Sequence, residues 1–352
     1  MDGEIGTFFM IWASIFTLAI YCYYVAETAP EGLVRLVMFL PVIFLFTVLP
    51  FKLNSVHLGC PTFFFISWLA NSKLLLLAFG TGPLSSGPPS LSLIPFVLFT
   101  CFPLNIQRNK VPKGERQIRD PLHFANCAIG VAILLYLGQN RDRLHRKVFL
   151  LCSTMYIYSG LDLMLSVVTL IGEILLSVEL ESPFNNPLKS TSLKDFWGRR
   201  WNRVASENLR TVVFWPIYNY STSRKVGHKW ALVNALIATF FMSAFIHELL
   251  MYYLGRTWPT FRITMFFIFH GVCLVVEAAV TSKFTGKWTR SMSKSVVTGP
   301  LIFGFVIGTA MWLLVQDMAD HKVEGRVVEE WIAFGAFLKD LGTFLVRKLL
   351  AL

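Results

Sequence analysis

Long apolar segments alternate with short polar ones along the whole chain. A helical membrane span needs about 20 apolar residues, and most of these segments approach that length. The pattern therefore predicts an all-α polytopic membrane protein with about eight to ten transmembrane helices and with amphipathic interfacial helices between them. The apolar segments are residues 7–26, 36–51, 60–79, 91–106, 121–138, 148–178, 230–254, 260–281 and 295–316.

Two of these segments have lengths that leave their structure open. Residues 91–106 are short for a crossing and would form a tilted or re-entrant helix. Residues 148–178 are long enough for one steeply tilted helix or for a bent pair of helices. After the last apolar segment, residues 322–352 are predicted to form a C-terminal amphipathic segment.

Composition supports a membrane protein. Of the 352 residues, 55% are hydrophobic and only 15% are charged, whereas soluble domains carry about 25% charged residues. We therefore expect one membrane-embedded domain over residues 1–352. Asp2 and Glu4 precede the first apolar segment where a signal peptide would be basic, so no cleaved signal peptide is expected. The six cysteines form no CxxC pair, and neither a disulfide framework nor a metal site is predicted.

Positive charge is concentrated in three polar segments. Residues 107–119, 139–147 and 182–229 carry 18 of the 32 Lys and Arg residues, and the net charge is +11. The positive-inside rule assigns such segments to the cytosol, where they contact anionic membrane lipids; no nucleic-acid partner is expected. Two of them flank the apolar segment 121–138. Either that segment is re-entrant or one flanking segment breaks the rule, and both alternatives stay open.

The basic segment 182–229 contains a patterned stretch, NPLKSTSLKDFWGRRWNRVASENLR, that begins at Asn186. Ser192 followed by Asp195 fits a capping box, after which the chain can continue as a helix. In such a helix Asp195 and Arg199 are partners four positions apart. The simplest interpretation is an amphipathic helix at the membrane interface.

The tryptophans and small residues of this stretch add to that interpretation. Trp197 and Trp201 would also lie four positions apart, at the level of the lipid headgroups. Gly198 and Asn202 would share one side of the helix, where Gly198 permits close approach of another chain. The arginines would point toward water or toward an anion; they are Arg199, Arg200 and Arg203.

A histidine and a glutamate lie inside the apolar segment 230–254, in the stretch SAFIHELLMYYLG. Intramembrane ionisable residues are costly and usually functional. His247, neutral among phenylalanines, suits the role of a general base. HELLM lacks the second histidine of HExxH, so no zinc protease is predicted. Glu248 points about 100° away around the helix, and we expect it to bind a basic or hydroxyl partner on another helix.

The helix face of His247 predicts room for a substrate. Ser243 and Ala244 are small residues one turn before the histidine, and Met251 one turn after it could line an acyl path. His270 and Glu277 share a face of the segment 260–281, and a polar contact that positions this helix is expected there. Buried charges without an assignable partner are Lys73, Asp162 and Glu173.

Three stretches carry a family resemblance. DFWGRRWN, followed 45 residues after its asparagine by His247, resembles the membrane-bound O-acyltransferases. FNNPLKSTSLKDFWGRRWN, WLANSKLLLLAFGTGPLSS and FIFHGVCLVVE are similar to the plant wax synthase branch of that family. The chain departs from that branch at NPLKSTSLKDF, where a PYLATSLQDF-like version is common.

The resemblance implies a reaction and its residues. It implies an acyl-CoA-dependent O-acyltransferase of the endoplasmic reticulum, with an intramembrane reaction chamber and no metal or prosthetic group. His247 would be the base, and Asn202 would orient it or donate to the thioester oxygen. The arginines offer charge that matches the phosphates of CoA. The residues expected to bind acyl-CoA are Trp197, Arg199, Arg200, Trp201 and Arg203.

The acceptor alcohol is the least determined part of this expectation. A long-chain fatty alcohol, giving a wax ester, is favoured because Phe240 and Phe241 crowd the turn before His247 and suit a linear molecule. A sterol, or diacylglycerol with an acetyl donor, is the alternative within the family. A transporter, in which ionisable groups line a pathway, is the alternative of another class, although no internal repeat supports it.

Overall fold

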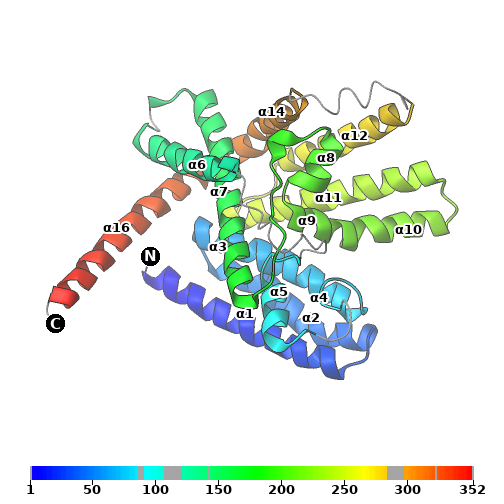
Figure 1. Cartoon of the computed structure of the whole chain (residues 1–352), viewed down its shortest axis with the longest axis horizontal. Helices are drawn as coiled ribbons and strands as arrows, with labels where there is room; N and C mark the ends of the chain where they lie inside the picture. The colour runs from blue at the N-terminus through cyan, green and yellow to red at the C-terminus, as the bar shows by residue number, and fades with distance from the viewer. Residues whose placement is uncertain are drawn as a thin grey trace.

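The described part of the chain is built from helices (Figure 1). The computed structural model describes residues 2–85, 91–106, 121–140, 143–283, 297–321 and 323–350. The single helices are α1 (Asp2–Thr28), α2 (Leu33–Val48), α5 (Leu93–Cys101), α6 (Pro121–Asn140), α7 (Arg146–Leu176), α11 (His228–Gly255), α12 (Arg262–Lys283) and α16 (Val323–Leu350).

Other helices change their winding without ending. One consists of α3 (Val56–Thr62), the π-helical turn η2 (Phe63–Ala70) and α4 (Asn71–Ala78); another consists of α14 (Thr298–Ala310), the π-helical turn η7 (Met311–Val315) and α15 (Gln316–Asp320). Short 3₁₀ turns are η1 (Leu49–Lys52) and η4 (Pro187–Lys189). The basic segment holds α8 (Leu193–Asp195), η5 (Phe196–Arg200), α9 (Arg203–Leu209), η6 (Arg210–Phe214) and α10 (Trp215–Ser223).

Helix length and hydropathy confirm a polytopic membrane protein. Among the described residues, 7 helices are long and apolar enough to cross a membrane. They are Gly3–Thr28, Leu33–Lys52, Val56–Ala78, Arg146–Leu176, His228–Gly255, Arg262–Thr281 and Thr298–Asp320. This number is below the eight to ten expected from the apolar segments, and the difference arises in two of them.

The two differing segments are the fourth and the fifth along the chain. Residues 91–106 contain only the nine-residue helix α5, which is too short to span a bilayer. Residues 121–138 form α6, whose apolar stretch Ala128–Leu137 is also short. Residues 148–178, by contrast, form one continuous helix of 31 residues rather than a bent pair. The basic segment 107–119 lies outside the described residues.

Helix α1 shows how the apolar segments divide between core and surroundings. Its buried positions Ile11, Ile15, Ala19 and Cys22 recur every three or four residues and therefore lie on one face. The rest of the helix exposes Phe9, Met10, Ile20, Tyr21 and Tyr24. Large apolar side chains on the outside of a helix suit hydrocarbon, so this face is the one that lipid covers.

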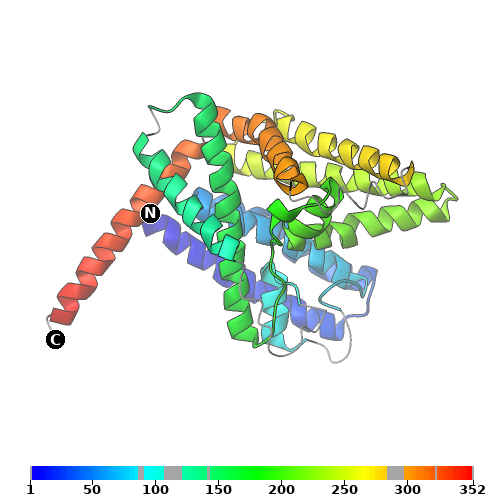
Figure 2. The same cartoon turned by 45° about the horizontal axis from the view of Figure 1, so that its top comes forward.

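Two groups of helices make up the body of the molecule (Figure 1). The N-terminal group contains α1, α2, α4 and α5, and the second group contains α10, α11 and α12. Helix α7 packs against the N-terminal group, where Gly172 lies against Leu104 just after α5, and it also contacts α14. Helix α16 leaves this body and extends to the C-terminus (Figure 2).

Helix α16 is fixed to the body at its base. The carboxylate of Glu330 accepts hydrogen bonds from the Ser55 hydroxyl (2.8 Å), the Val56 amide (2.6 Å) and the His57 amide (3.0 Å) at the start of α3. Burial would raise the pKa of Glu330, but the hydrogen bonds from His57, Val56 and Ser55 hold it at about 2. Glu330 thus joins the C-terminal helix to the N-terminus of α3.

Candidate active site

The basic segment begins with the capping interaction that its sequence predicts. Ser192 Oγ accepts a hydrogen bond from the Asp195 amide (3.0 Å). In a capping box the N3 carboxylate would accept a hydrogen bond from the amide of Ser192. Here Asp195 Oδ2 accepts from the amide of the preceding residue, Thr191, instead (3.1 Å). Burial would raise the pKa of the Asp195 carboxyl, but hydrogen bonds from Arg200 and Thr191 hold it below its usual value.

The expected pair of Asp195 with Arg199 is wrong. Residues 196–200 form a wide π-helical turn, which shifts the partner of residue i from i+4 to i+5. Arg200 Nε therefore donates to Asp195 Oδ2 (2.6 Å), while Arg199 is exposed to the surroundings.

The helix expected to continue through residue 202 ends at Trp201. Trp201 is extended (φ −87°, ψ 125°) and Asn202 adopts the left-handed conformation (φ 35°). Asn202 Oδ1 then accepts from the Ala205 amide (3.1 Å) and caps α9. Asparagine suits this position because its short side chain tolerates the left-handed region. Gly198 and Asn202 consequently do not share one side of a single helix.

The tryptophans pack inside the protein rather than facing lipid headgroups. Trp201 stacks on Tyr158 (ring centroids 5.4 Å apart) and on Phe196 (5.4 Å), and meets the edge of Phe184 (5.3 Å). Trp197 contacts Trp201 (6.2 Å), as its spacing predicts. These contacts hold the turn η5 against α7.

The three arginines expected to bind acyl-CoA are in different environments. Arg200 also donates to the carbonyl of Asn185 (3.2 Å), so its guanidinium is engaged in the protein. Arg203 is paired with Glu181. Arg199 is the exposed one of the three. Two of the three therefore hold the segment together in this structure.

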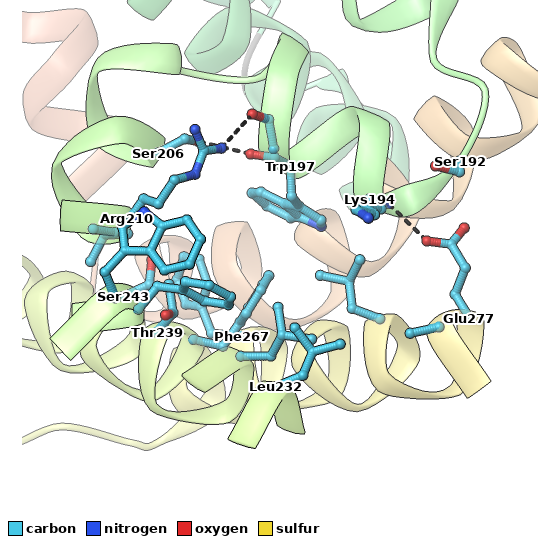
Figure 3. A pocket seen from close by; sticks show the side chains of 18 of the residues that line it. Ser192, Lys194, Trp197, Ser206, Arg210, Leu232, Thr239, Ser243, Phe267 and Glu277 are labelled. Atoms are coloured by element: carbon cyan, nitrogen blue, oxygen red, sulfur yellow. Dashed lines mark hydrogen bonds between the residues drawn. The ribbon is translucent and has the colours of Figure 1, made fainter. Parts of the chain in front are cut away.

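A cavity of about 620 Å³ lies beneath this segment (Figure 3). This volume is typical of a small-molecule site. Turns η5 and η6 and helix α10 contribute to its walls, as do α11 and α12. The apolar part of the lining is Leu209, Phe214, Trp215, Leu232, Leu236, Phe240, Phe267, Leu274 and Ala278.

Polar side chains around the cavity include two cations that the sequence did not single out, Lys194 and Arg210. Arg210 donates to the Gly198 carbonyl (3.0 Å) (Figure 3). It also donates to Glu207 (2.9 Å). Ser206 Oγ donates to the Trp197 carbonyl (2.7 Å). The turn at residues 201–202 folds η6 back on η5, and the spacing of the arginines gives no sign of that contact.

His247 lies one helical turn beyond Ser243, the last residue of α11 that lines the cavity. Its Nδ1 lies 2.7 Å from the Ser243 carbonyl, and its ring centroid is 4.5 Å from that of Phe267. Ser243 and Phe267 both line the cavity, although His247 itself does not. A carbonyl oxygen only accepts, so Nδ1 carries the proton and the lone pair of a neutral ring is on Nε2. The histidine is therefore in the tautomer that leaves Nε2 able to take a proton.

The other residues expected near His247 are divided. Ser243 lines the cavity, whereas Ala244 and Met251 are buried in the hydrophobic core. Asn202 is 7% exposed and neither lines the cavity nor hydrogen-bonds to His247 in the described structure.

Glu248 binds a hydroxyl partner on another helix, as expected. Its Oε1 accepts from both the amide (3.0 Å) and the hydroxyl (2.9 Å) of Thr264, in the first turn of α12. Its Oε2 is buried without a hydrogen-bond partner. The two adjacent residues of the apolar helix thus face different surroundings, one toward Phe267 and the other toward the start of α12.

His270 and Glu277 each position a different neighbour of α12. His270 contacts Thr309 Oγ1 of α14 (2.9 Å) and accepts from the Trp197 indole (3.4 Å). Glu277 accepts from the amides of Leu193 (3.0 Å) and Lys194 (2.9 Å). Neither bonds to the other, so each fixes the basic segment over the cavity independently.

Partners are found for the three buried charges left open by the sequence. Lys73 donates to the carbonyls of Phe99 (2.5 Å) and Phe102 (2.8 Å) at the end of α5. Asp162 accepts from Asn126 (2.8 Å), and Glu173 accepts from the Leu180 amide (3.2 Å). These are structural contacts away from the cavity.

Comparison with known proteins shows the family to which this chain belongs. A model described as the membrane bound O-acyl transferase family matches residues 180–269, which include the basic segment, His247 and part of α12. Acyl-CoA–sterol O-acyltransferase 1 of Arabidopsis thaliana is 34% identical over 340 residues, which cover 96% of this chain and 97% of that protein. The long-chain-alcohol O-fatty-acyltransferase of Simmondsia chinensis is 35% identical over 339 residues, which cover 94% of this chain and 95% of that protein.

A third relative has the same extent of similarity. The probable long-chain-alcohol O-fatty-acyltransferase 3 of Arabidopsis thaliana is 36% identical over 341 residues, covering 96% of this chain and 97% of that protein. Each comparison runs over almost the full length of both chains. The chain therefore belongs to the membrane-bound O-acyltransferase family, in its wax synthase-like branch, and is an acyltransferase.

Proposed function

We propose that this enzyme transfers a fatty acyl group from acyl-CoA to a long-chain fatty alcohol, giving a wax ester, with His247 as general base. The observation that carries the proposal is the tautomer of His247 next to the cavity lining. Its Nδ1 is committed to the Ser243 carbonyl (2.7 Å), which leaves Nε2 available to a substrate hydroxyl.

The reaction follows from that arrangement. Nε2 of His247 takes the proton from the alcohol as its oxygen attacks the thioester carbonyl. The carbon–sulfur bond then breaks, and the thiolate of CoA receives the proton from the imidazolium, which restores the neutral base. The Ser243 carbonyl stabilises the imidazolium between these two steps because it accepts from Nδ1. The surrounding apolar walls exclude the water that would hydrolyse the thioester.

The cavity suits a donor with an anionic head and a long arm. Lys194 and Arg210 lie in its lining, and Arg199 is exposed in the same segment. We assign the phosphates of CoA to these three cations. Arg210 is paired with Glu207 but lines the cavity, whereas Arg200 and Arg203 are paired and do not line it. The donor binds without a metal or prosthetic group.

In this proposal Asn202 supports the cavity wall and does not take part in the reaction itself. Its side chain begins α9, the helix that carries Ser206 and Leu209 and leads into Arg210. Replacement of Asn202 by Ala removes a helix cap and displaces this wall, since capping is worth about 1 kcal/mol. The resulting loss of activity is indirect, in contrast to the loss expected at His247.

A linear acceptor is favoured by the shape of the site. The cavity follows α11 from Leu232 to Ser243, a distance of about 16 Å at 1.5 Å per residue. Phe240 and Phe267 both line the cavity, and the Phe267 ring contacts that of His247 (4.5 Å). A sterol is the second candidate, because one relative of similar identity is named a sterol O-acyltransferase. The relatives give no support to the transporter alternative.

We place the enzyme in the endoplasmic reticulum membrane, with the segment 182–229 in the cytosol, where acyl-CoA arrives. The nine basic residues of that segment support this orientation.

The test is lipid analysis of a host deficient in neutral lipids that expresses the chain, followed by assays of purified enzyme with labelled palmitoyl-CoA. Hexadecanol should be esterified faster than a sterol or diacylglycerol. A preference for sterol would replace the acceptor and keep the reaction class. Movement of label across the membrane without ester formation would contradict the enzymatic proposal itself.

A further inference from the structure

Gly198 lies in the wall of the cavity, and no contact within the described part of the chain requires a glycine there. Its backbone is not in the left-handed region, which is the usual reason for glycine. A Cβ built on it would have Arg210 Nη2 as its nearest heavy atom, at 4.0 Å. Glycine within a helical turn also weakens that turn relative to alanine. The protein alone would therefore tolerate or prefer a side chain at this position.

Other glycines of the chain are required by a close contact or by a positive φ. At Gly299 a Cβ would lie 1.8 Å from the Leu188 carbonyl oxygen, and at Gly59 it would lie 1.9 Å from the Tyr253 hydroxyl. Gly80 combines a positive φ of 67° with a close approach of Glu31. Gly198 has neither property, so the space that its missing side chain leaves belongs to the cavity.

The surroundings of Gly198 indicate which substrate uses that space. Lys194 and Arg210 line the same cavity, and Arg210 donates to the Gly198 carbonyl (3.0 Å). The carboxylate in the lining, Glu277, is committed to two backbone amides. With two cations against that one carboxylate, the lining carries a net positive charge, which favours the anionic substrate over an uncharged alcohol. The molecule that passes Gly198 is therefore the one that carries phosphate.

We propose that Gly198 is a steric gate for the acyl donor: the arm between the CoA phosphates and the thioester passes directly against its backbone on the way to His247. This inference rests on the proposed use of acyl-CoA. It assigns Gly198 to substrate selection, in which the absence of a side chain sets the width of the donor path.

The experiment compares Gly198→Ala and Gly198→Val with the same changes at Gly160. Gly160, in α7, is a matched control because it is also part of a helix and its Cβ would meet nothing within 4 Å. It does not line the cavity. For each purified variant, the KM values for palmitoyl-CoA and hexadecanol, kcat and thermal stability are measured. Binding of a non-reactive thioether analogue of palmitoyl-CoA is measured as well.

An added methyl group in a fitted site typically changes discrimination by about tenfold or more. Gly198→Ala should raise the palmitoyl-CoA KM about tenfold, and Gly198→Val should raise it further. The KM for hexadecanol should stay at the wild-type value, and thermal stability should not fall, because glycine is the weaker helix former. Both Gly160 variants should leave the two KM values, kcat and the analogue affinity unchanged.

Several results would overturn the gate. An unchanged donor KM and analogue affinity in Gly198→Ala would remove Gly198 from the donor path. A rise confined to the hexadecanol KM would assign the space to the acceptor. If Gly198→Val does not fold, Gly198→Ala decides alone, since analogue binding is measured on folded protein. Each of these results is compatible with ester synthesis by the wild-type enzyme and contradicts only the role of Gly198. The proposed function itself would fail if the wild-type enzyme made no ester from any acyl-CoA.

Discussion

Replacement of Glu248 should disturb catalysis through the helix opposite His247. Glu248 is 6% exposed, and its Oε1 accepts two hydrogen bonds from Thr264 at the start of α12. Thr264 precedes Phe267 by one turn, and the Phe267 ring contacts that of His247 (4.5 Å). Glu248→Ala should therefore loosen the position of Phe267 and lower kcat, while the donor KM changes little.

The size of the effect follows from the hydrogen bonds and from the unpaired oxygen. Each bond to a carboxylate contributes about 1.5 kcal/mol at the low end, so the loss of two costs about 3 kcal/mol. Oε2 is buried without a hydrogen-bond partner, so its removal stabilises the fold by at least about 1 kcal/mol. The net destabilisation of Glu248→Ala is then about 2 kcal/mol. Glu248→Gln keeps the accepting Oε1 and should stay within about 1 kcal/mol of wild type.

The assay is a double-mutant cycle with Thr264→Val, which replaces the hydroxyl group by a methyl group of similar size. Stability in mixed micelles and kcat are measured for wild type, both single variants and the double variant. The coupling free energy between the two sites should be about 1.5 kcal/mol, the contribution of one such bond, because the hydroxyl has no carboxylate to bind once Glu248 is truncated. Thr264→Ser, which keeps the hydroxyl, is the control.

Two outcomes would refute this reasoning. One is additive behaviour of Glu248→Ala and Thr264→Val, which would mean that the two side chains do not act on each other. The other is equal damage by Glu248→Gln and Glu248→Ala. That result would show that the negative charge, and not the position of α12, is what the enzyme requires.

Three further predictions concern separate parts of the molecule. His247→Ala should lower ester synthesis from labelled acyl-CoA by about 10² to 10⁴ at near-normal membrane abundance; more than a tenth of wild-type activity would contradict the assignment. Arg200→Ala should reduce thermal stability, because it removes the partner of Asp195, whereas Arg199→Ala should raise only the acyl-CoA KM. The Glu330 contact stabilises the fold above pH 4.5 and is lost as the pH falls toward 2, so an acid titration should unfold Glu330→Gln with a smaller pH dependence than wild type.

The sequence predicts most of the membrane architecture because burial in hydrocarbon leaves a direct signal. The helix expected at 230–254 corresponds to α11 (His228–Gly255), and the one expected at 260–281 corresponds to α12. The sequence predicts a basic or hydroxyl partner for Glu248 on another helix because an unpaired carboxylate is costly there, and the Thr264 hydroxyl is that partner. These predictions depend only on the solvent and on hydrogen-bonding chemistry.

The basic segment was harder to predict because its winding changes within a few residues. The expected pairing of Asp195 with Arg199 assumes 3.6 residues per turn, and the wide turn η5 replaces it with Arg200. The left-handed Asn202 then reverses the chain, so Arg210 reaches the Gly198 carbonyl. Hydrophobic periodicity contains no information about such a turn, since the interactions that select it come from other helices.

Those outside interactions explain why the turn forms here. Glu277 of α12 holds the amide of Lys194, and His270 of the same helix accepts from the Trp197 indole. Both contacts lie on the helix that also carries Phe267 against His247. Helix α12 thus positions both the part of the basic segment that covers the cavity and the phenylalanine ring that contacts His247. A shift of α12 would therefore move donor site and base together, which makes this helix the element on which their relative geometry depends.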